Sequence, residues 1–406
     1  MSLPRVKTGL DRLVAEDFAA LRGRRVGAIV NPTAIDREFR HLADLLHASP
    51  SVALTALFGP EHGVRGDAQD MIGVEHAVDA QTGVPVYSLY GDGFASLRPT
   101  EEQLDGLDAL VFDIQDVGSR YYTFAATLKY TMIQAAHAGL SVFVLDRPNP
   151  IDGVSAEGPL VSQGYESFVS AHPLPIRHGL TIGELARVFQ SDEELDLDLH
   201  VVELEGWDRS RLWRETELPW VAPSPNMPTP ETALVYPGGC LIEGTNLSEG
   251  RGTTRPFELV GAPWLDAAAL ARSLNDEGLP GVHFRPCAFV PMFHKHKGQV
   301  CQGVQAHVTG PRRFRPVASY TALIIRARDQ DPKQFTWRTE EYEFVTNPIA
   351  IDLLYGSSEP RRRIERDHRA WQFREQRPLL GSRARLPRTV RGVRRGRGDV
   401  RGPERA

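Results

Sequence analysis

An apolar run passes directly into a loop of glycine, proline and charged residues at Val52-Ala53-Leu54-Thr55-Ala56-Leu57-Phe58-Gly59-Pro60-Glu61-His62-Gly63-Val64-Arg65-Gly66-Asp67. The apolar half predicts a strand that is buried on both faces. Glycines allow a loop to bring its backbone close to a ligand, and α/β proteins place chemistry in loops at the carboxyl ends of buried strands. Glu61 is therefore the first candidate for a catalytic carboxyl group. A tight surface turn with solvated charges is the alternative.

Similar apolar runs occur on both sides of this stretch, and helical patterns separate them. The expected strands are Arg25–Val30, Val52–Phe58, Val84–Leu89, Ala109–Ile114 and Ser141–Asp146, and the expected helices between them include Phe39–Ala48 and Tyr121–Ala138. This alternation predicts an α/β fold, a Rossmann-like and mostly parallel sheet with helices on both faces. Polar segments follow each run, so the carboxyl edge of the sheet is the expected binding site.

The second half of the chain has a different pattern. Expected elements are the helices Ile182–Gln190, Leu265–Asn275 and Val317–Arg328, a Pro-rich crossing at Pro219–Pro230, a polar loop at Gly238–Thr254, and alternating strands at His283–Val290 and Val300–Val308. Alternation of this kind is typical of antiparallel strands. We therefore expect a Rossmann-like catalytic lobe over residues 1–230, a smaller α+β lobe over 231–358, and an Arg-rich, largely disordered or divergent tail over 359–406.

Charge and cysteine content narrow the class of protein. Residues 361–406 hold 16 Arg and 5 acidic residues, so this segment carries +11 and the rest of the chain carries −16 of the total of −5. An acidic body argues against a specific nucleic-acid partner. The 3 cysteines form no CxxC pair, and neither an apolar leader nor an apolar run of membrane length is visible. We expect a cytoplasmic protein with no membrane partner; the sequence does not predict the oligomeric state.

Carboxylates in glycine-rich settings carry the chemistry that the sequence favours. Cleavage of an acetal such as a glycosidic bond needs a group that protonates the leaving oxygen and a second group that acts as base or nucleophile. The candidates are Glu61, Asp67, Asp113, Asp116, Glu157, Glu243 and Glu249. The segment from Glu243 to Thr253 also holds Asn246 and Arg251 between glycines, which leaves room for a sugar. A loop that is closed by its own polar side chains is the alternative.

The segment from Phe112 to Tyr122 closes a buried strand and opens a helix. There Asp113 could coordinate a metal or orient a hydroxyl, and Arg120 could hold a carboxylate. Asp116 could equally be a helix cap. The pair His294 and His296 has no further ligands at a set spacing, so a metal site is disfavoured. No cofactor is expected.

Taken together, these segments resemble the exo-β-N-acetylmuramidase family of bacterial cell-wall recycling, long described as a domain of unknown function. The motifs that carry the resemblance run from Gly9-Leu10-Asp11 through Val26–Thr33, Phe58–Ala68, Pro85–Gly91, Phe112–Tyr122, Leu145–Pro150, Glu157-Gly158-Pro159, His178–Leu185, Pro223–Thr229, Glu243–Thr253, Pro256–Glu258, Gly261–Trp264 and Cys301–Val304. They cover roughly residues 8 to 355 in order, and the Arg-rich end has no counterpart.

The resemblance implies an enzyme that removes N-acetylmuramic acid from the non-reducing end of peptidoglycan fragments, in a cleft between two lobes. It matches Glu61 and Glu157 to catalytic carboxyl groups, without saying which is acid and which is base. A lactyl carboxylate would need a cation. The implied substrate-binding residues, these cations included, are His62, Arg65, Asp113, Asp116, Arg120, Arg147, Asn226, Asn246, Glu249 and Arg251.

Two other classes of function remain open from the sequence. One is a sugar-binding or muropeptide-binding protein that has the same cleft but does not catalyse. The other is a metal-dependent hydrolase that uses Asp113, Asp116 and His62. Sensitivity to a chelator would distinguish the second from a carboxylate glycosidase, for which no metal is expected.

Overall fold

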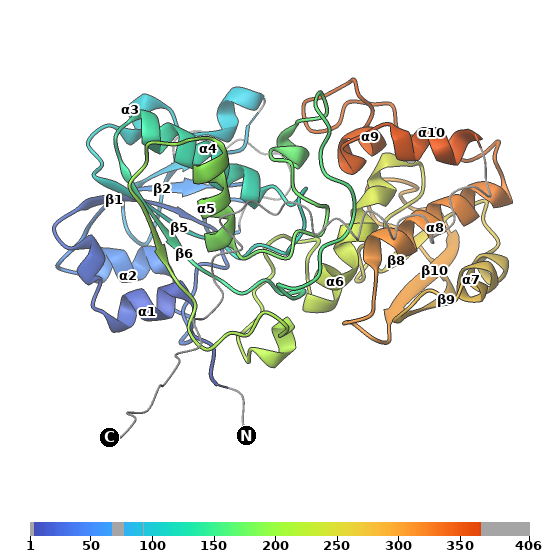
Figure 1. The fold of residues 1–406 in the computed structure, drawn as a ribbon, viewed down its shortest axis with the longest axis horizontal. Coiled ribbons are helices and arrows are strands. Elements are labelled where there is room, and N and C mark those ends of the chain that lie inside the picture. Colours follow the sequence, from blue (N-terminus) through green and yellow to red (C-terminus); the bar gives the residue numbers. More distant parts are fainter. Residues whose placement is uncertain (1–3, 67–76, 92, 367–406) are drawn as a thin grey trace, which may run out of the picture.

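The computed structural model describes residues 4–66, 77–91 and 93–366, and these form two lobes that lie side by side (Figure 1). The first lobe is built on a mostly parallel sheet. The second is built on a smaller antiparallel sheet with its own helices. Both sheets and their order along the chain agree with the predicted α/β class.

Within the described residues, seven strands form the first sheet in the order β3-β4-β2-β1-β5-β6-β7. Their bounds are β1 Arg25–Val30, β2 Ala53–Gly59, β3 Ala77–Val78, β4 Pro85–Ser88, β5 Ala109–Asp113, β6 Ser141–Leu145 and β7 Leu199–Val202. Neighbouring strands pair in parallel, except that β3 pairs antiparallel with β4. Because β2 and β5 flank β1, the loops that follow these three strands leave the same edge of the sheet.

Helices cover both faces of this sheet. One face carries α1 (Gly9–Ala15) and α2 (Leu42–Ala48), and the other carries α4 (Phe124–His137) and α5 (Ile182–Asp192), with the short α3 at Glu101–Leu104. The start of α5 is fixed by a capping box, in which the side chain of Thr181 accepts from the Glu184 amide and the Glu184 side chain accepts from the Thr181 amide. Continuous burial of β1, β5 and β6 explains their unbroken apolar sequences.

The second lobe holds an antiparallel sheet in the order β8-β10-β9. Its elements are α6 Pro230–Gly239, β8 Leu259–Ala262, α7 Ala267–Asp276, β9 Val282–Phe289, β10 Cys301–Val308, α8 Pro316–Gln330, α9 Ala350–Tyr355 and α10 Glu359–Arg366. The side chain of Asn275 at the end of α7 donates to the carbonyl of Phe284 and accepts from its amide, which ties α7 to β9.

One apolar core continues from the first sheet into the second lobe. It includes Phe112 of β5, Tyr236 of α6, Leu323 of α8 and Leu353 of α9, all buried. The opposite face of the first sheet has a separate core beneath α1 and α2. The two lobes therefore share their main hydrophobic core, although each has its own sheet.

Several elements differ from the sequence prediction. The short strands β7 and β8 were not expected; each has four residues, too few for a clear pattern. The expected loop from Gly238 to Thr254 is wrong in its first part. Gly238 and Gly239 end α6, and Cys240–Gly244 form a 3₁₀ turn. Pro230 and Pro237 concealed α6, because proline usually marks a break in a helix.

Part of the segment predicted as a tail is helical in the structure. The first eight residues of the 359–406 segment form α10, and residues 367–406 lie outside the described residues. Among the helices that the structure describes, none is long and apolar enough to cross a bilayer.

Candidate active site

A cleft of about 530 Å³, part of it open to solvent, lies between the carboxyl edge of the first sheet and the second lobe. Both lobes contribute to its walls. The polar and aromatic residues that line it are Glu61, His62, Tyr121, Tyr122, Thr123, Ser224, Asn226, Tyr236, Glu243, Arg251, Tyr342 and Glu343, with Phe124, Val169, Met227 and Phe257 between them. Of the site residues predicted from sequence, Glu61, His62, Asn226 and Arg251 come together here.

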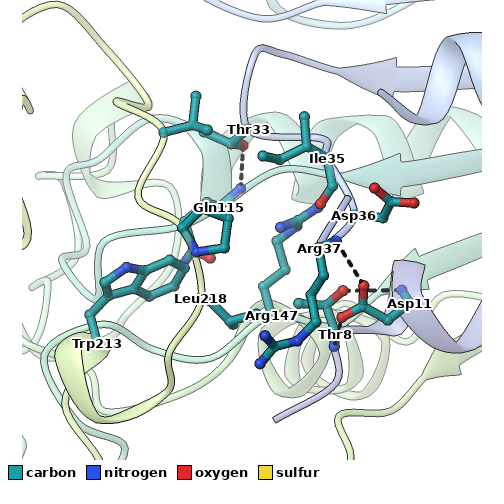
Figure 2. A pocket seen from close by; sticks show the side chains of 12 residues that line it. Thr8, Asp11, Thr33, Ile35, Asp36, Arg37, Gln115, Arg147, Trp213 and Leu218 are labelled. Atoms are coloured by element: carbon teal, nitrogen blue, oxygen red, sulfur yellow. Dashed lines mark hydrogen bonds between the residues drawn. The ribbon is translucent and has the colours of Figure 1, made fainter. Parts of the chain in front are cut away.

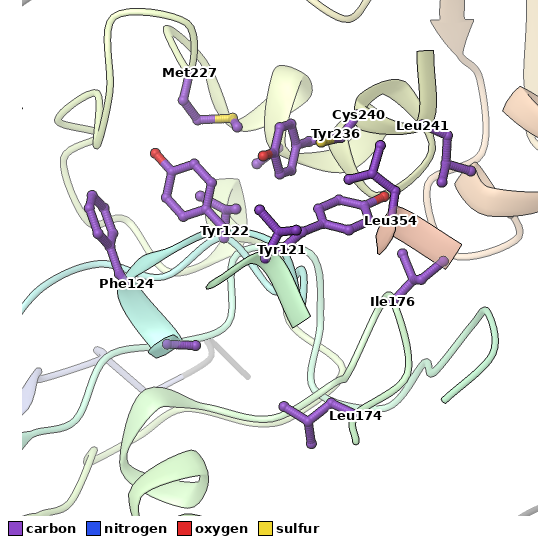
Figure 3. Packing of buried hydrophobic residues seen from close by; sticks show 14 of the residues in the cluster. Tyr121, Tyr122, Phe124, Leu174, Ile176, Met227, Tyr236, Cys240, Leu241 and Leu354 are labelled. Carbon is purple, nitrogen blue, oxygen red and sulfur yellow. The ribbon is translucent and has the colours of Figure 1, made fainter. Parts of the chain in front are cut away.

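Packed aromatic rings form one wall of the cleft (Figure 3). The Tyr122 ring meets Tyr236 edge to face at 5.5 Å between centroids and Phe124 at 4.9 Å. Tyr121 donates its hydroxyl to the Pro237 carbonyl, which joins the start of α4 to α6. Such a wall offers a sugar an apolar face and lowers the polarity around the nearby carboxyl groups.

Glu61 enters the cleft from the loop after β2. Its side chain is 23% exposed, and its Oε2 accepts a hydrogen bond from Oγ1 of Thr123 at 3.2 Å. Thr123 precedes the first turn of α4, so the carboxyl group lies near a helix N-terminus, where negative charge is favoured. Nε2 of His62 is 3.9 Å from Oε1 of Glu61, and His62 has a left-handed backbone with φ of 74°. The Gly-rich loop thus presents an acid beside an imidazole.

The second lobe supplies two more carboxyl groups, Glu243 and Glu343. Oε1 of Glu243 accepts from Nη2 of Arg251 at 2.7 Å, and its Oε2 accepts from the Tyr342 hydroxyl at 2.7 Å. Oε2 of Glu343 accepts from the Tyr90 hydroxyl at 3.2 Å. Burial, together with the negative charges of Glu61 and Glu243, raises the pKa of Glu343 to about 7. The cleft therefore holds carboxyl groups in different environments.

Arg251 is the centre of a buried charge network. Besides Glu243, its guanidinium approaches Oε1 of Glu249 at 3.6 Å, and Oε2 of Glu249 is 2.8 Å from Nζ of Lys295. Burial would raise the pKa of Glu249, but the charges of Lys295 and Arg251 outweigh it, and the pKa lies below its ordinary value. The ring of Phe257 lies 5.2 Å from the guanidinium carbon. Glu249 itself does not line the cleft.

Asp113 and Arg147 pair with each other beneath the first sheet's edge. Nη2 of Arg147 donates to Oδ2 of Asp113 at 2.8 Å, and a second contact makes the pair bidentate. Both side chains are buried, and Arg147 also donates to the carbonyl of Ile35. This pair joins the ends of β5 and β6 to the segment after β1.

Arg147 also borders a second, smaller pocket, which Figure 2 shows from close by. Its charged groups have partners within the protein: the Arg37 amide donates to Asp11, and the Arg37 guanidinium donates to the carbonyl of Val6. Gln115 donates from its side chain to the carbonyls of Asp116 and Pro148. These contacts tie the amino-terminal segment to the sheet.

Arg120 and Asp116 have partners in the loops behind the aromatic wall. The Arg120 guanidinium donates to three carbonyls, those of Pro159, Leu174 and Leu354, at 2.6 to 2.7 Å. Oδ2 of Asp116 accepts from the Gly118 amide at 2.6 Å and lies 3.3 Å from Nε2 of His178. Neither lines the cleft.

Glu157 lies in the contact between the two lobes. Its Oε1 accepts from the Ala318 amide in the first turn of α8 at 2.8 Å, and its backbone pairs with that of Arg177. Burial raises the pKa of Glu157 to about 7. Its side chain is not among those that line the cleft.

The remaining two predicted residues also contact protein groups. Arg65 forms ion pairs with Asp44 and Asp79. The side chain of Asn246 donates to the Gln334 carbonyl at 2.7 Å and accepts from the Thr336 amide at 3.1 Å. Asp67, a further candidate carboxylate, lies outside the described residues.

Among the residues that the structure describes, no group of three or more His, Cys, Asp and Glu side chains could hold a metal ion. The three residues of the metal-hydrolase alternative have separate partners: Asp113 has Arg147, Asp116 has His178, and His62 lies beside Glu61. Their geometry does not favour a shared metal.

Among the residues that line the cleft, sequence reasoning did not select Tyr122, Tyr342 and Glu343, and it named Glu243 as a candidate carboxylate without assigning it to the site. Glu243 was visible as a carboxylate in a Gly-rich segment, and Tyr122 as part of the segment that ends β5. Tyr342 and Glu343 follow Glu340 and Glu341, and such an acidic run is typical of a solvated surface. Nothing in that run indicates that its last member reaches a cleft.

Comparison with known proteins places both lobes in one family. Residues 26–231 match the N-terminal model of the exo-beta-N-acetylmuramidase NamZ family, and residues 234–377 match its C-terminal model. The peptidoglycan beta-N-acetylmuramidase NamZ of Bacillus subtilis (strain 168) is 46% identical over 362 residues, which are 89% of this chain and 85% of the relative.

Two crystal structures of DUF1343 family proteins from Bacteroides fragilis NCTC 9343 share the fold. One has a TM-score of 0.83 at 37% identity and the other a TM-score of 0.70 at 27% identity; each match covers 93% of this chain and 98% of the other. The resemblance seen in the sequence motifs is thus confirmed over both lobes, and the chain belongs to the exo-beta-N-acetylmuramidase NamZ family.

Proposed function

We propose that this chain is an exo-acting glycoside hydrolase that releases N-acetylmuramic acid from the non-reducing end of peptidoglycan-derived saccharides, with Glu61 as a catalytic carboxyl group. The observation that carries the proposal is the position of Glu61 in a cleft that also holds further carboxyl groups and an aromatic wall. The family membership and the activity named for the Bacillus subtilis relative support it.

Glycosidic cleavage needs two carboxyl groups in different protonation states. Glu61 lies near the amino end of α4, where the helix interacts favourably with negative charge, and it accepts a hydrogen bond from Thr123. The pKa of Glu343, raised to about 7, favours the neutral form at lower pH. Such a difference is what separates the acid from the base or nucleophile in this chemistry.

A muramic acid residue carries a lactyl carboxylate, and we infer that Arg251 receives it. Of the four arginines that the sequence offers for this role, Arg251 lines the cleft while it pairs with Glu243, whereas Arg65, Arg120 and Arg147 do not line it. A planar guanidinium can bind a carboxylate through two parallel hydrogen bonds. Asn226, buried at the cleft wall, is available to a sugar amide or hydroxyl.

The test is release of N-acetylmuramic acid from a MurNAc-GlcNAc disaccharide and from a chromogenic muramide, with and without chelator. Release that resists chelator is expected for the wild type. Glu61→Gln should lower kcat by several orders of magnitude while the fold is retained, because it removes an essential ionisable group. Glu101→Gln, which changes an exposed carboxyl group of α3, is the matched control.

A non-catalytic binding protein is the alternative class. It would bind the saccharide without turnover, and Glu61→Gln would then leave the only measurable activity, binding, in place. A small saccharide as partner and a cytoplasmic location are part of the main proposal. The three free thiols, Cys240, Cys287 and Cys301, are compatible with a reducing compartment.

A further inference from the structure

The turn from Tyr342 to Val345 holds Glu343 in the cleft with a strained backbone. Tyr342 and Val345 exchange both backbone hydrogen bonds, at 2.9 and 3.0 Å. The two residues between them, Glu343 and Phe344, have φ angles of 47° and 66°. A two-residue turn with positive φ at both central positions normally uses glycine or asparagine. A left-handed backbone is strained for a residue with a Cβ, and such strain clusters at functional sites.

A hydrogen bond from the first lobe orients the Glu343 carboxyl group, and contacts of its neighbours Phe344 and Tyr342 hold the turn in place. The Tyr90 hydroxyl, from the segment after β4, donates to its Oε2 at 3.2 Å. The Tyr90 ring also packs against Phe344, with centroids 6.2 Å apart. On the other side, the Tyr342 hydroxyl is directed to Glu243. The carboxyl group therefore has a defined orientation in the cleft.

The charged and titratable groups that face Glu343 come from several elements. Glu61 follows β2, Glu243 lies in the 3₁₀ turn after α6, Arg251 follows that turn, and Tyr90 follows β4. The two glutamates disfavour ionisation of Glu343, whereas Tyr90 and Arg251 favour it. Burial is the largest influence, and together with the two glutamates it raises the pKa of Glu343 to about 7.

We propose that Glu343 is the proton donor of the cleft and that Glu61, from the opposite lobe, is its partner carboxylate. This assignment rests on the glycosidase function proposed above and pairs Glu61 with Glu343 in place of Glu157, which the resemblance implied as a catalytic carboxyl group and which lies outside the cleft. Each lobe then supplies one of the two carboxyl groups.

The proposed step balances as a hydrolysis. Glu343 transfers its proton to the glycosidic oxygen as the bond from C1 of the muramic acid residue to that oxygen breaks, and the rest of the saccharide leaves as an alcohol. One water supplies its hydroxyl to C1. Its remaining proton goes to the carboxylate pair and restores the starting protonation. No oxidant, reductant or further reactant is needed.

Two leaving groups separate a proton donor from a residue that merely supports the fold. A p-nitrophenyl muramide needs little protonation of its leaving oxygen, whereas the disaccharide alcohol needs it fully. Glu343→Gln should therefore lower kcat/KM for the disaccharide by about 10²–10⁴-fold and for the p-nitrophenyl muramide by less than about 10-fold. For the wild type we expect kcat/KM for the disaccharide to decline above about pH 7, as Glu343 loses its proton. This decline should be absent from Glu343→Gln.

Glu341→Gln is the control, because Glu341 is exposed in the same segment and the Arg338 guanidinium contacts its backbone carbonyl, which the substitution keeps. It should leave both rates and the pH profile unchanged. Equal loss on both substrates for a folded Glu343→Gln would overturn the assignment. If that variant fails to fold, Glu343→Asp serves instead, and the same contrast between substrates is required.

Different outcomes would refute the proposed glycosidase function and the assignment of Glu343 as proton donor. Wild-type protein that hydrolyses neither substrate would refute the glycosidase and with it the donor. Wild-type activity that Glu61→Gln abolishes on both substrates, combined with Glu343→Gln activity that is normal on both, would keep the glycosidase and refute the donor.

Discussion

Arg251 donates from Nη2 to Oε1 of Glu243 at 2.7 Å, and both side chains line the same cleft. The guanidinium also lies near Glu249, so one cation compensates two largely buried carboxylates. In surroundings of low polarity, loss of Arg251 leaves Glu243 without its cation and Glu249 with Lys295 alone, and an uncompensated buried charge costs far more than the pair contributes. Arg251 therefore also stabilises the structure of the cleft.

Replacement of Arg251 should affect both stability and substrate binding. Arg251→Met should lower the free energy of unfolding by about 3 kcal/mol, because Glu243 and Glu249 lose a charge partner. Arg251→Lys should keep most of the stability but raise KM for muramic acid substrates, because an ammonium cannot form the two parallel bonds. Urea unfolding and steady-state kinetics measure the two effects. Arg272→Met, on the exposed face of α7, should change neither.

Glu157→Gln should make stability less dependent on pH. Glu157 is buried with a pKa raised to about 7, so in the folded protein it stays protonated over a range where the unfolded chain ionises. Stability is therefore greatest below about pH 4.5 for this group and falls as pH rises to about 7, by up to about 3 kcal/mol. The glutamine keeps an oxygen for the Ala318 amide, so the variant should exceed the wild type in stability at pH 8.

Turnover of the same variant separates two roles for Glu157. A residue outside the cleft should leave kcat within a few-fold of the wild type. If kcat instead falls by several orders of magnitude while the fold is intact, Glu157 takes part in catalysis. That result would contradict the assignment of Glu343 as the second catalytic carboxyl group.

Lys295 should prove essential to the conformation of the loop between β9 and β10. Its ammonium donates to the carbonyls of Ile242 and Leu247 at 3.1 and 2.9 Å and contacts Glu249. Lys295→Met should destabilise the protein by about 2–4 kcal/mol and speed proteolysis within residues 290–300, because these carbonyls lose their donor. Lys297→Met, at an exposed position of the same loop, is the control and should resemble the wild type.

Asp113 and Arg147 should behave as a structural pair. Asp113→Asn should cost about 3–5 kcal/mol of stability, because Arg147 is then buried without its counterion, while KM stays near the wild-type value. The double variant Asp113→Leu with Arg147→Met should be more stable than either single variant. A specific rise in KM for Asp113→Asn would show that the pair reaches the substrate after all. Chemical denaturation and saccharide kinetics provide both readings.

The central strands β1, β5 and β6 of the first sheet were predictable because they are buried on both faces and therefore consist of apolar runs, as Ala109–Asp113 illustrates. Helix α6 was not predictable, since Pro237, Gly238 and Gly239 look like a break. The structure explains Gly238 by close packing: a Cβ at this position would lie 2.1 Å from the Pro316 carbonyl oxygen of α8. The residues Pro237, Gly238 and Gly239 thus suggest a loop when only the sequence is considered, whereas in the structure they allow a close contact between two helices.

The site was predictable only where local sequence carries the signal. Glu61 follows a buried strand in a Gly-rich loop, and this setting distinguished it. Glu343 meets Tyr90, which is 253 positions away in the chain, and that contact depends on how the two lobes are packed. Likewise, Arg147 and Arg251 both stand near glycine or proline in the sequence and both pair with a carboxylate, and only the folded structure shows that Arg251 faces the cleft.

The position of helix α6 has a practical consequence for anyone who divides this chain. The two family matches meet between residues 231 and 234, inside the first turn of α6 (Pro230–Gly239), and α6 packs on α8 within the core that both lobes share. A cut at that point would open a buried helix and expose apolar surface on both fragments. The two halves can therefore be aligned separately, but they should not be expressed as separate fragments. Split reporters or truncations should be placed in exposed loops instead.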